Sequence, residues 1–125
     1  MMAPSTSESV VVEGKISWGA YTPEHLASLR TAGKAVFIDF TADWCLTCKV
    51  NEKAALNRPE VARAFASKNI VALKADWTNT DAAVTKALEG YGRNSIPLYV
   101  YYPAGGGDFK ILPQVLTPKN VVSAL

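Results

Sequence analysis

The chain has 125 residues and a net charge of +2, with 49% of its residues apolar and 19% charged. This length fits one domain that can bury a core without cross-links, and the composition is that of a globular protein rather than a disordered one. So small a charge gives no field favouring nucleic acid or an anionic membrane. No apolar run approaches the roughly 18 residues that a membrane helix needs.

The N-terminal segment lacks the charged and then apolar stretches of a secretory signal. Met1–Ser9 is small and polar, and Val10–Val12 is a candidate for a short edge strand. We therefore expect residues 1–15 to form a flexible leader and residues 16–125 to form the folded domain.

Helices and apolar strands alternate along the folded part. Thr22-Pro23-Glu24 begins a helix with a hydroxyl cap, a proline and an acid, and Gly33 ends it. Thr117-Pro118 begins the last helix in the same way, and a glycine-rich turn at residues 103–108 predicts a hairpin. The predicted strands are Ala35–Thr41, Ile70–Ala75, Leu98–Tyr102 and Phe109–Leu112, and the predicted helices are Thr22–Thr31, Cys45–Leu56, Asn57–Ala66, Thr80–Glu89 and Thr117–Leu125.

This order of elements predicts an α/β fold. Short helices that alternate with buried strands favour a mostly parallel central sheet covered on both faces. The closing hairpin supplies an antiparallel edge, so the sheet is mixed, and one extra helix precedes the first long strand.

The most informative motif is Trp44-Cys45-Leu46-Thr47-Cys48-Lys49. It holds both cysteines of the chain, two residues apart, where a buried strand gives way to a helix. The free N–H groups and the dipole at a helix N-terminus favour negative charge, which makes the first cysteine easier to ionise. We therefore interpret the pair as a redox-active site that cycles between dithiol and disulfide.

Three other interpretations of the cysteines are weaker. A structural zinc site needs four ligands, whereas Cys45, Cys48 and His25 supply three at most, and a surface histidine is the simpler expectation for His25. A purely structural disulfide over so short a loop removes little chain entropy from the unfolded state. Two buried thiols without a role remain as the third alternative.

The segment from Lys34 to Leu125 resembles the thioredoxin superfamily. The resemblance rests on a strand, the Trp-Cys-x-x-Cys-Lys motif, and Ser95-Ile96-Pro97 leading into a later strand. The longer string from Phe40 to Glu52 closely resembles the C-terminal periplasmic domain of the DsbD/ScsB-type membrane thiol-disulfide reductases, as do the segments around Trp18 and residues 112–117. This resemblance implies a thioredoxin fold and a protein-disulfide reductase.

The attacking and resolving roles of the two thiols follow from their place on the helix. Cys45 lies at its start, where we expect an exposed nucleophile, and Cys48 lies one turn inward, where we expect a shielded resolving thiol. Asp39 is an acid inside an apolar strand, at the position where the superfamily carries a buried acid beneath the cysteines. We expect it to accept the proton of Cys48, and a strand-end aspartate facing water is the alternative.

Three further side chains are candidates around the cysteines. Glu52 falls on the helical stripe of Cys45 and Cys48, where its charge would raise the cysteine pKa; the alternative is a solvated Glu52 paired with Lys49. The resemblance implies that Pro97 is cis and that the backbone at Ile96 pairs with an extended substrate; the alternative is an ordinary strand-start proline.

The aromatic side chains near the motif divide into two groups. We expect Trp44 to flank the cysteine pair as an apolar contact surface for the substrate. Trp18 and Trp77 are expected to be packing residues.

The direction of the reaction is predicted from the residues between the cysteines. Leu46 and Thr47 carry no positive charge that would stabilise a thiolate, and Asp39 and Glu52 disfavour one, so we expect a reductant. The expected partners are protein disulfides and dithiols of other redox domains, and a transmembrane domain of the same parent protein that supplies electrons. We expect no metal, no nucleic acid and no cofactor besides the Cys45–Cys48 disulfide.

The resemblance also implies a setting for the chain. It would be a periplasmic, monomeric domain, excised from an inner-membrane protein or made independently. Two alternatives stay open: a free-standing thioredoxin-like reductase, and a non-catalytic binding or chaperone-like module with the same fold.

Overall fold

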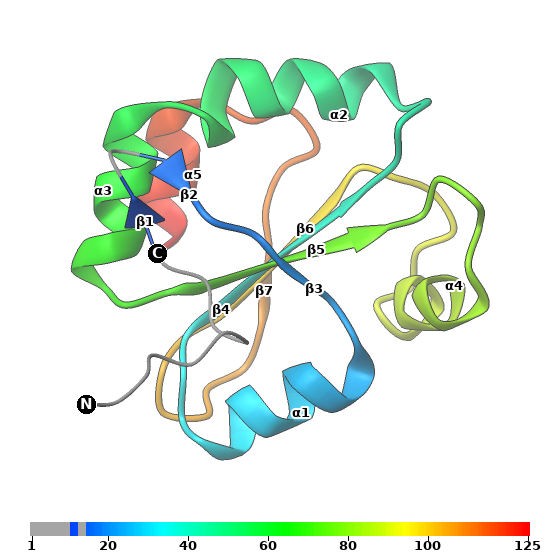
Figure 1. Ribbon diagram of the computed structural model, residues 1–125, viewed down its shortest axis with the longest axis horizontal. Helices are drawn as coiled ribbons and strands as arrows, with labels where there is room; N and C mark the ends of the chain where they lie inside the picture. The colour runs from blue at the N-terminus through cyan, green and yellow to red at the C-terminus, as the bar shows by residue number, and fades with distance from the viewer. Residues whose placement is uncertain (1–10, 13–14) are drawn as a thin grey trace.

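The computed structural model describes residues 11–12 and 15–125 and has a five-stranded sheet at its centre (Figure 1). The order of the strands across the sheet is β3-β5-β4-β6-β7. β3, β5 and β4 run parallel, β6 is antiparallel to β4, and β7 is antiparallel to β6. Their bounds are β3 Gly19–Ala20, β4 Val36–Thr41, β5 Val71–Asp76, β6 Leu98–Tyr102 and β7 Lys110–Ile111.

The mixed sheet with helices on both faces confirms the predicted fold class. The antiparallel part is larger than expected, because β6 already opposes the central strand β4. Strand β3 was not predicted, since Gly19–Ala20 has no apolar alternation; it adds to β5 as a parallel edge strand.

Two groups of helices cover the two faces of the sheet (Figure 1). One group consists of α1 and α4, and the other of α2, the π-helix η1, α3 and α5. Their bounds are α1 Pro23–Thr31, α2 Leu46–Asn51, η1 Glu52–Leu56, α3 Pro59–Ser67, α4 Ala82–Gly90 and α5 Pro118–Ala124. None of these helices, within the described part of the chain, is long and apolar enough to cross a bilayer.

Helices α1 and α5 begin at the capping threonines that the sequence predicted. The Thr22 hydroxyl accepts the backbone N–H of His25 at 3.0 Å, and Pro23 opens α1. Thr117 and Asn120 form a reciprocal capping box at the start of α5. Gly33, with φ +75°, follows the end of α1 in a backbone conformation that favours glycine.

The helix predicted from Cys45 to Leu56 is divided into two segments. After α2 the backbone widens into η1, where the N–H of Asn57 donates to the carbonyl of Glu52 at 2.7 Å. Such π-turns arise inside α-helices and often occur at functional sites. Helix α4 also differs from the predicted range Thr80–Glu89, because it begins after the Asp81 cap and includes Gly90.

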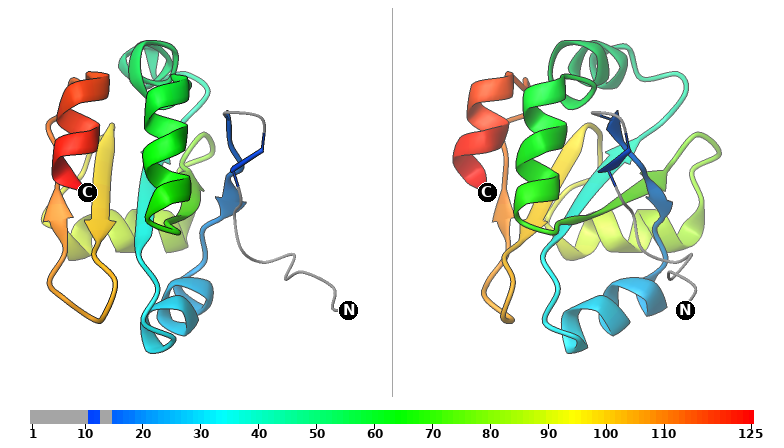
Figure 2. Two further views of the ribbon diagram at one scale, coloured as in Figure 1. Left: turned by 90° about the vertical axis from the view of Figure 1, so that its left-hand side faces the viewer. Right: turned by 60° about the vertical axis from the view of Figure 1, so that its left-hand side comes forward.

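The N-terminal strand forms a small ladder of its own. β1 Val11–Val12 pairs antiparallel with β2 Lys15–Ile16, so it is not an edge of the main sheet. This pair lies beside α3 (Figure 2). The predicted leader Met1–Ser9, together with Val10, lies outside the described residues, and the boundary between leader and domain stays a prediction.

Successive side chains of β4 point alternately into two hydrophobic cores, one on each face of the sheet. Val36, Ile38 and Phe40 pack with α1 and α4, whereas Phe37 packs with the core beneath α3 and α5. Because successive side chains of a strand point to opposite faces, Asp39 shares the face of Phe37, which is the face that carries α2. The pleat of the central strand thus places an acid below the cysteine helix.

We expect Phe37→Ala to lower the free energy of unfolding by about 3 to 5 kcal/mol, because Phe37 is fully buried and its ring lies 5.2 Å from that of Phe65 and 6.2 Å from that of Trp18. Urea unfolding measures the change. Val122→Ala, at a partly exposed position, is the control and should change the stability by less than about 0.5 kcal/mol. Equal effects of the two substitutions would contradict this core assignment.

Candidate active site

The two cysteines lie where β4 passes into α2, and they form a disulfide. Their Cα atoms are 5.2 Å apart. Cys45 is the N-cap of α2, and its sulfur accepts the backbone N–H of Cys48 at 3.2 Å. The first sulfur therefore occupies the position where free helix N–H groups favour negative charge.

The two sulfurs differ in access to solvent, but less than expected. Cys48 is completely buried, and Cys45 retains only 7% of its surface. The expectation of an exposed Cys45 is thus wrong, because Ala42 and Ile96 pack against the pair and form a small apolar cluster with it. Cys45 is nevertheless the more accessible of the two.

The peptide bond between Ile96 and Pro97 is cis, which confirms the prediction for this proline. Ile96 packs against the cysteine pair, and β6 begins directly after Pro97. The cis-proline segment is thereby brought against the disulfide, although the two are 48 or more residues apart in the chain.

Three apolar side chains that lie within two residues of a cysteine in the sequence are exposed. Trp44 is 56% exposed, Leu46 78% and Val50 55%. The indole N–H of Trp44 donates to the carbonyl of Thr78 at 2.9 Å, and its ring lies 6.0 Å from that of Trp77. Trp44 is thus exposed next to Cys45 with Trp77 packed against it, and its role as a contact surface for the substrate stays a prediction.

Asp39 is 1% exposed, and neither oxygen of its carboxyl group has a hydrogen-bond partner among the described residues. Its pKa is raised from the usual 3.8 to about 7, mainly by burial; the charge of Lys74 lowers the pKa, that of Glu52 raises it, and that of Lys49 lowers it. An aspartate facing water at the end of the strand is excluded. A carboxyl group with a pKa near neutrality can both accept and release a proton.

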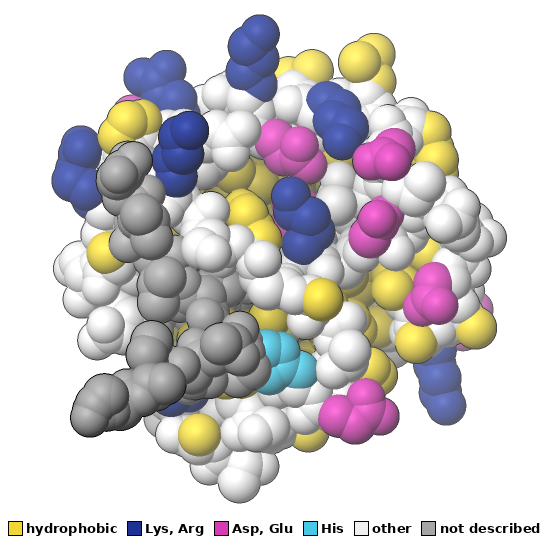
Figure 3. All heavy atoms as spheres, in the orientation of Figure 1, with side chains coloured by type: hydrophobic (Ala, Val, Ile, Leu, Met, Phe, Trp, Pro, Cys, Tyr) yellow, Lys and Arg dark blue, Asp and Glu magenta, His cyan; other side chains and the backbone are white. Residues whose placement is uncertain are grey.

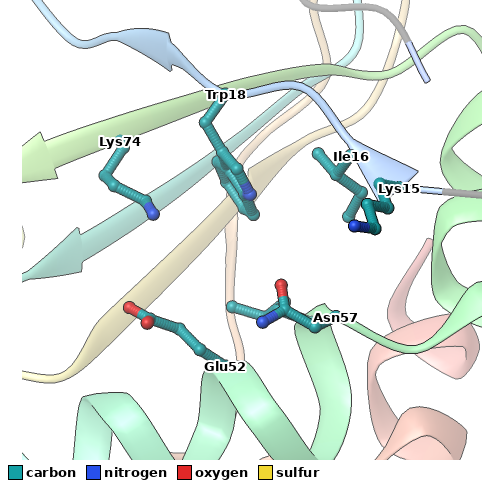
Figure 4. A pocket seen from close by; sticks show the side chains of 7 residues that line it. Lys15, Ile16, Trp18, Glu52, Asn57 and Lys74 are labelled. Carbon is teal, nitrogen blue, oxygen red and sulfur yellow. The ribbon is translucent and has the colours of Figure 1, made fainter. Parts of the chain in front are cut away.

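Glu52 is half-buried and lies beside β4. Its carboxylate accepts the hydroxyl of Thr41 at 3.2 Å. It also lines a pocket of about 390 Å³ together with Trp18 and Lys74, and Figure 4 shows its carboxylate pointing to the side where Lys74 lies. The alternative of a solvated pair with Lys49 is not what the structure shows, since the amine of Lys49 lies 3.7 Å from Asp43.

A family model described as thioredoxin-like matches residues 17–104. The chain belongs to the thioredoxin-like family. Among curated relatives, it is 33% identical over 87 residues to the thiol:disulfide interchange protein DsbD 1 of Pseudomonas aeruginosa and 35% identical over 82 residues to DsbD of Cronobacter sakazakii. These matches cover 70% and 66% of this chain but only 14% of each relative, so the chain corresponds to a small part of them.

Solved structures identify which part of DsbD is similar. The C-terminal domain of Neisseria meningitidis DsbD in its oxidised form matches with a TM-score of 0.67 and 26% identity, over 86% of this chain and 95% of that domain. Its reduced form matches with a TM-score of 0.66 over 83% of this chain. The resemblance predicted from the string around the cysteines is therefore confirmed.

Two features of this thioredoxin-like site were missed from the sequence. Val115, just before α5, is 67% exposed. Asn51 is a buried polar residue on α2 whose amide bonds to Tyr99 and to residues 114 and 116. Neither has a local signal, since each depends on how distant segments meet.

The described residues contain no cluster of metal-binding side chains. Within the described residues, no group of three or more His, Cys, Asp or Glu side chains could hold a metal ion. His25, expected at the surface, is half-buried in α1. Figure 3 shows basic side chains mostly over α2 and α3 and acidic ones mostly toward α4, so neither sign dominates this face.

Asp39 should make the stability of the oxidised protein depend on pH. The folded state holds this proton more tightly than the unfolded chain, so the stabilisation is complete below pH 3.8 and is lost as the pH rises through about 7. Between these values the free energy of unfolding should fall by up to about 1.4 kcal/mol per pH unit because of this group.

Urea unfolding at several pH values tests the effect. Asp39→Asn should remove this slope, whereas Val84→Ala, which removes buried apolar atoms and no titratable group, should keep it. An unchanged slope in Asp39→Asn would show that the carboxyl group titrates normally.

Proposed function

We propose that this chain is a thiol:disulfide oxidoreductase that reduces protein disulfides through Cys45 and Cys48. The observation that carries the proposal is the Cys45–Cys48 disulfide at the start of α2, packed against the cis Ile96–Pro97 segment. The similarity to DsbD proteins, which are named as thiol:disulfide interchange proteins, supports the same chemistry.

The reaction begins with the dithiol form. The Cys45 thiolate attacks a disulfide of the partner, forms a mixed disulfide and releases one partner thiolate. Asp39 accepts the proton of Cys48, and the Cys48 thiolate then attacks the Cys45 sulfur. This step forms the Cys45–Cys48 bond, breaks the mixed disulfide and releases the second partner thiolate, so two electrons pass to the partner.

Side chains around the pair favour the reductive direction. Leu46 and Thr47 supply no positive charge between the cysteines, and the carboxyl groups of Asp39 and Glu52 lie on the side of α2 that faces the sheet. A thiolate near these groups is disfavoured, which makes the dithiol ready to give up its electrons. Lys49 acts against this, but it is exposed and paired with Asp43.

The partner of this reaction is a disulfide held in an extended segment. Such a segment would pair with the backbone at Ile96 and contact Trp44 beside the recessed Cys45. Electrons would reach the domain from a transmembrane domain of the same parent protein, and the setting would be the periplasm. The DsbD relatives, of which the match covers 14%, are the basis for this arrangement, and a free-standing reductase is the second candidate.

Insulin reduction by dithiothreitol tests the activity. The native protein should accelerate it, and Cys45→Ser should abolish the acceleration. Cys48→Ser, reduced beforehand and mixed with insulin after dithiothreitol has been removed, should accumulate a mixed disulfide because the resolving thiol is missing. Equal rates with native protein and Cys45→Ser would instead favour a non-catalytic binding module.

The pKa of the Cys45 thiol in the reduced protein should lie above about 7, the value typical of thioredoxin, because the neighbouring carboxyl groups disfavour the thiolate. Thiolate absorbance during a pH titration measures it, and Asp39→Asn combined with Glu52→Gln should lower the value. A native pKa of about 6 or lower would contradict the reductive direction.

A further inference from the structure

The buried side chain of Asn51 lies three residues after the resolving cysteine on α2 and takes no part in the reaction described above. We propose that Asn51 is the positioning residue for Cys48, which holds this thiol in place for the second step of disulfide exchange. The proposal rests on the proposed function, because it assigns Asn51 a part in that reaction.

Asn51 and Cys48 share one face of α2. They are three residues apart, so their side chains lie one above the other, and both are buried, at 1% and 0% exposure. Contacts that hold the Asn51 side chain against the rest of the protein therefore also hold the helical turn that carries Cys48.

Hydrogen bonds use the whole amide group of Asn51. Its nitrogen donates to the hydroxyl of Tyr99 at 2.8 Å and to the carbonyl of Gln114 at 2.7 Å, and its oxygen accepts the N–H of Leu116 at 3.0 Å. A buried amide with each of its groups paired is a strong constraint, since breaking any bond leaves a buried polar atom without a partner.

Two of the three bonds lead to residues that are connected to the cis-proline segment. Tyr99 lies on β6, two residues after Pro97. Gln114 supplies the carbonyl that Asn51 bonds, and its side-chain amide donates to the carbonyl of Pro97 at 3.5 Å. Asn51 thus joins the cysteine helix to the cis-proline segment along two routes.

The helix that carries Cys48 is short, which makes its connection through Asn51 important. The α-helical part that holds Cys48 has 6 residues, and the π-turn η1 begins immediately after Asn51. The regular α-helical register is therefore not continued below the cysteines, and the polar contacts of Asn51 fix the short segment against the sheet.

The two steps of exchange depend differently on this position. Attack by Cys45 on a partner disulfide needs only the sulfur at the helix start. The second step needs the Cys48 sulfur in line with the bond between Cys45 and the partner, so it is sensitive to small displacements of the turn that carries Cys48. Loss of Asn51 should slow the second step selectively.

Reaction with the aromatic disulfide dithiobis(nitrobenzoate) distinguishes the two steps. One equivalent is mixed with the reduced protein in a stopped-flow instrument, and the absorbance of the released thiolate is followed. The first release reports attack by Cys45, and the second reports resolution of the mixed disulfide by Cys48. Asn51→Leu should slow the second release by about tenfold or more and leave the first nearly unchanged.

A matched control distinguishes positioning from general loss of stability. Val121→Ala truncates a fully buried side chain in the core on the same face of the sheet, and it should keep the native ratio of the two rates. If Asn51→Leu changes neither rate, or slows both equally, the proposal is wrong.

Two further outcomes are decisive. If Asn51→Leu does not fold, Tyr99→Phe removes one of the three bonds and should still slow only the second release; an unchanged ratio in this variant would overturn the proposal. If the native protein itself releases no second thiolate, the proposed function fails, which is a different result from a normal native protein with an unaffected Asn51→Leu variant.

Discussion

A carboxyl group enclosed in the central strand is the constraint on which the site depends. Asp39 lies in β4, and its partners in the strand ladders are Lys74 of β5 and Tyr99 of β6. Neither oxygen of its carboxyl group has a hydrogen-bond partner among the described residues. Burying an ionisable group without partners is costly, and the cost appears as a pKa near 7 rather than near 4. The central strand thus holds, on the sheet face that carries α2, a carboxyl group whose pKa is near neutrality.

Much of this site follows from local chemistry in the sequence. The cysteine spacing, the threonine caps of α1 and α5 and the apolar run of β4 each depend on neighbouring residues, and the structure agrees with them. Burial of Asp39 could be predicted because an acid within an apolar run has few alternatives. The cis bond at Pro97 was predicted from family resemblance rather than from the residues themselves.

The parts that could not be predicted depend on long-range contacts. Asn51 looks like an ordinary helical polar residue until residues 114–116 and Tyr99, which are 48 or more positions away, are placed against it. The π-turn at η1, where Ala55 and Leu56 are buried, has no signal in the helical pattern of the sequence. The recessed position of Cys45 likewise depends on Ile96, which arrives from the other end of the domain.

Tyr99 is a neighbour of both groups to which the proposed reaction gives a role at the resolving thiol. Its ring stands opposite Asp39 across the β4–β6 ladder, and its hydroxyl accepts the amide of Asn51. Burial and the charge of Asp39 raise the pKa of Tyr99, while the hydrogen bond from Asn51 acts in the other direction. The phenol of Tyr99 is neutral at the pH values at which thiols exchange. It can therefore keep Asn51 in place without adding a charge beside Asp39. In the proposed reaction, the acid that takes the proton from Cys48 and the amide that positions Cys48 are therefore both neighbours of one buried side chain, which is hydrogen-bonded to the amide and not to the acid.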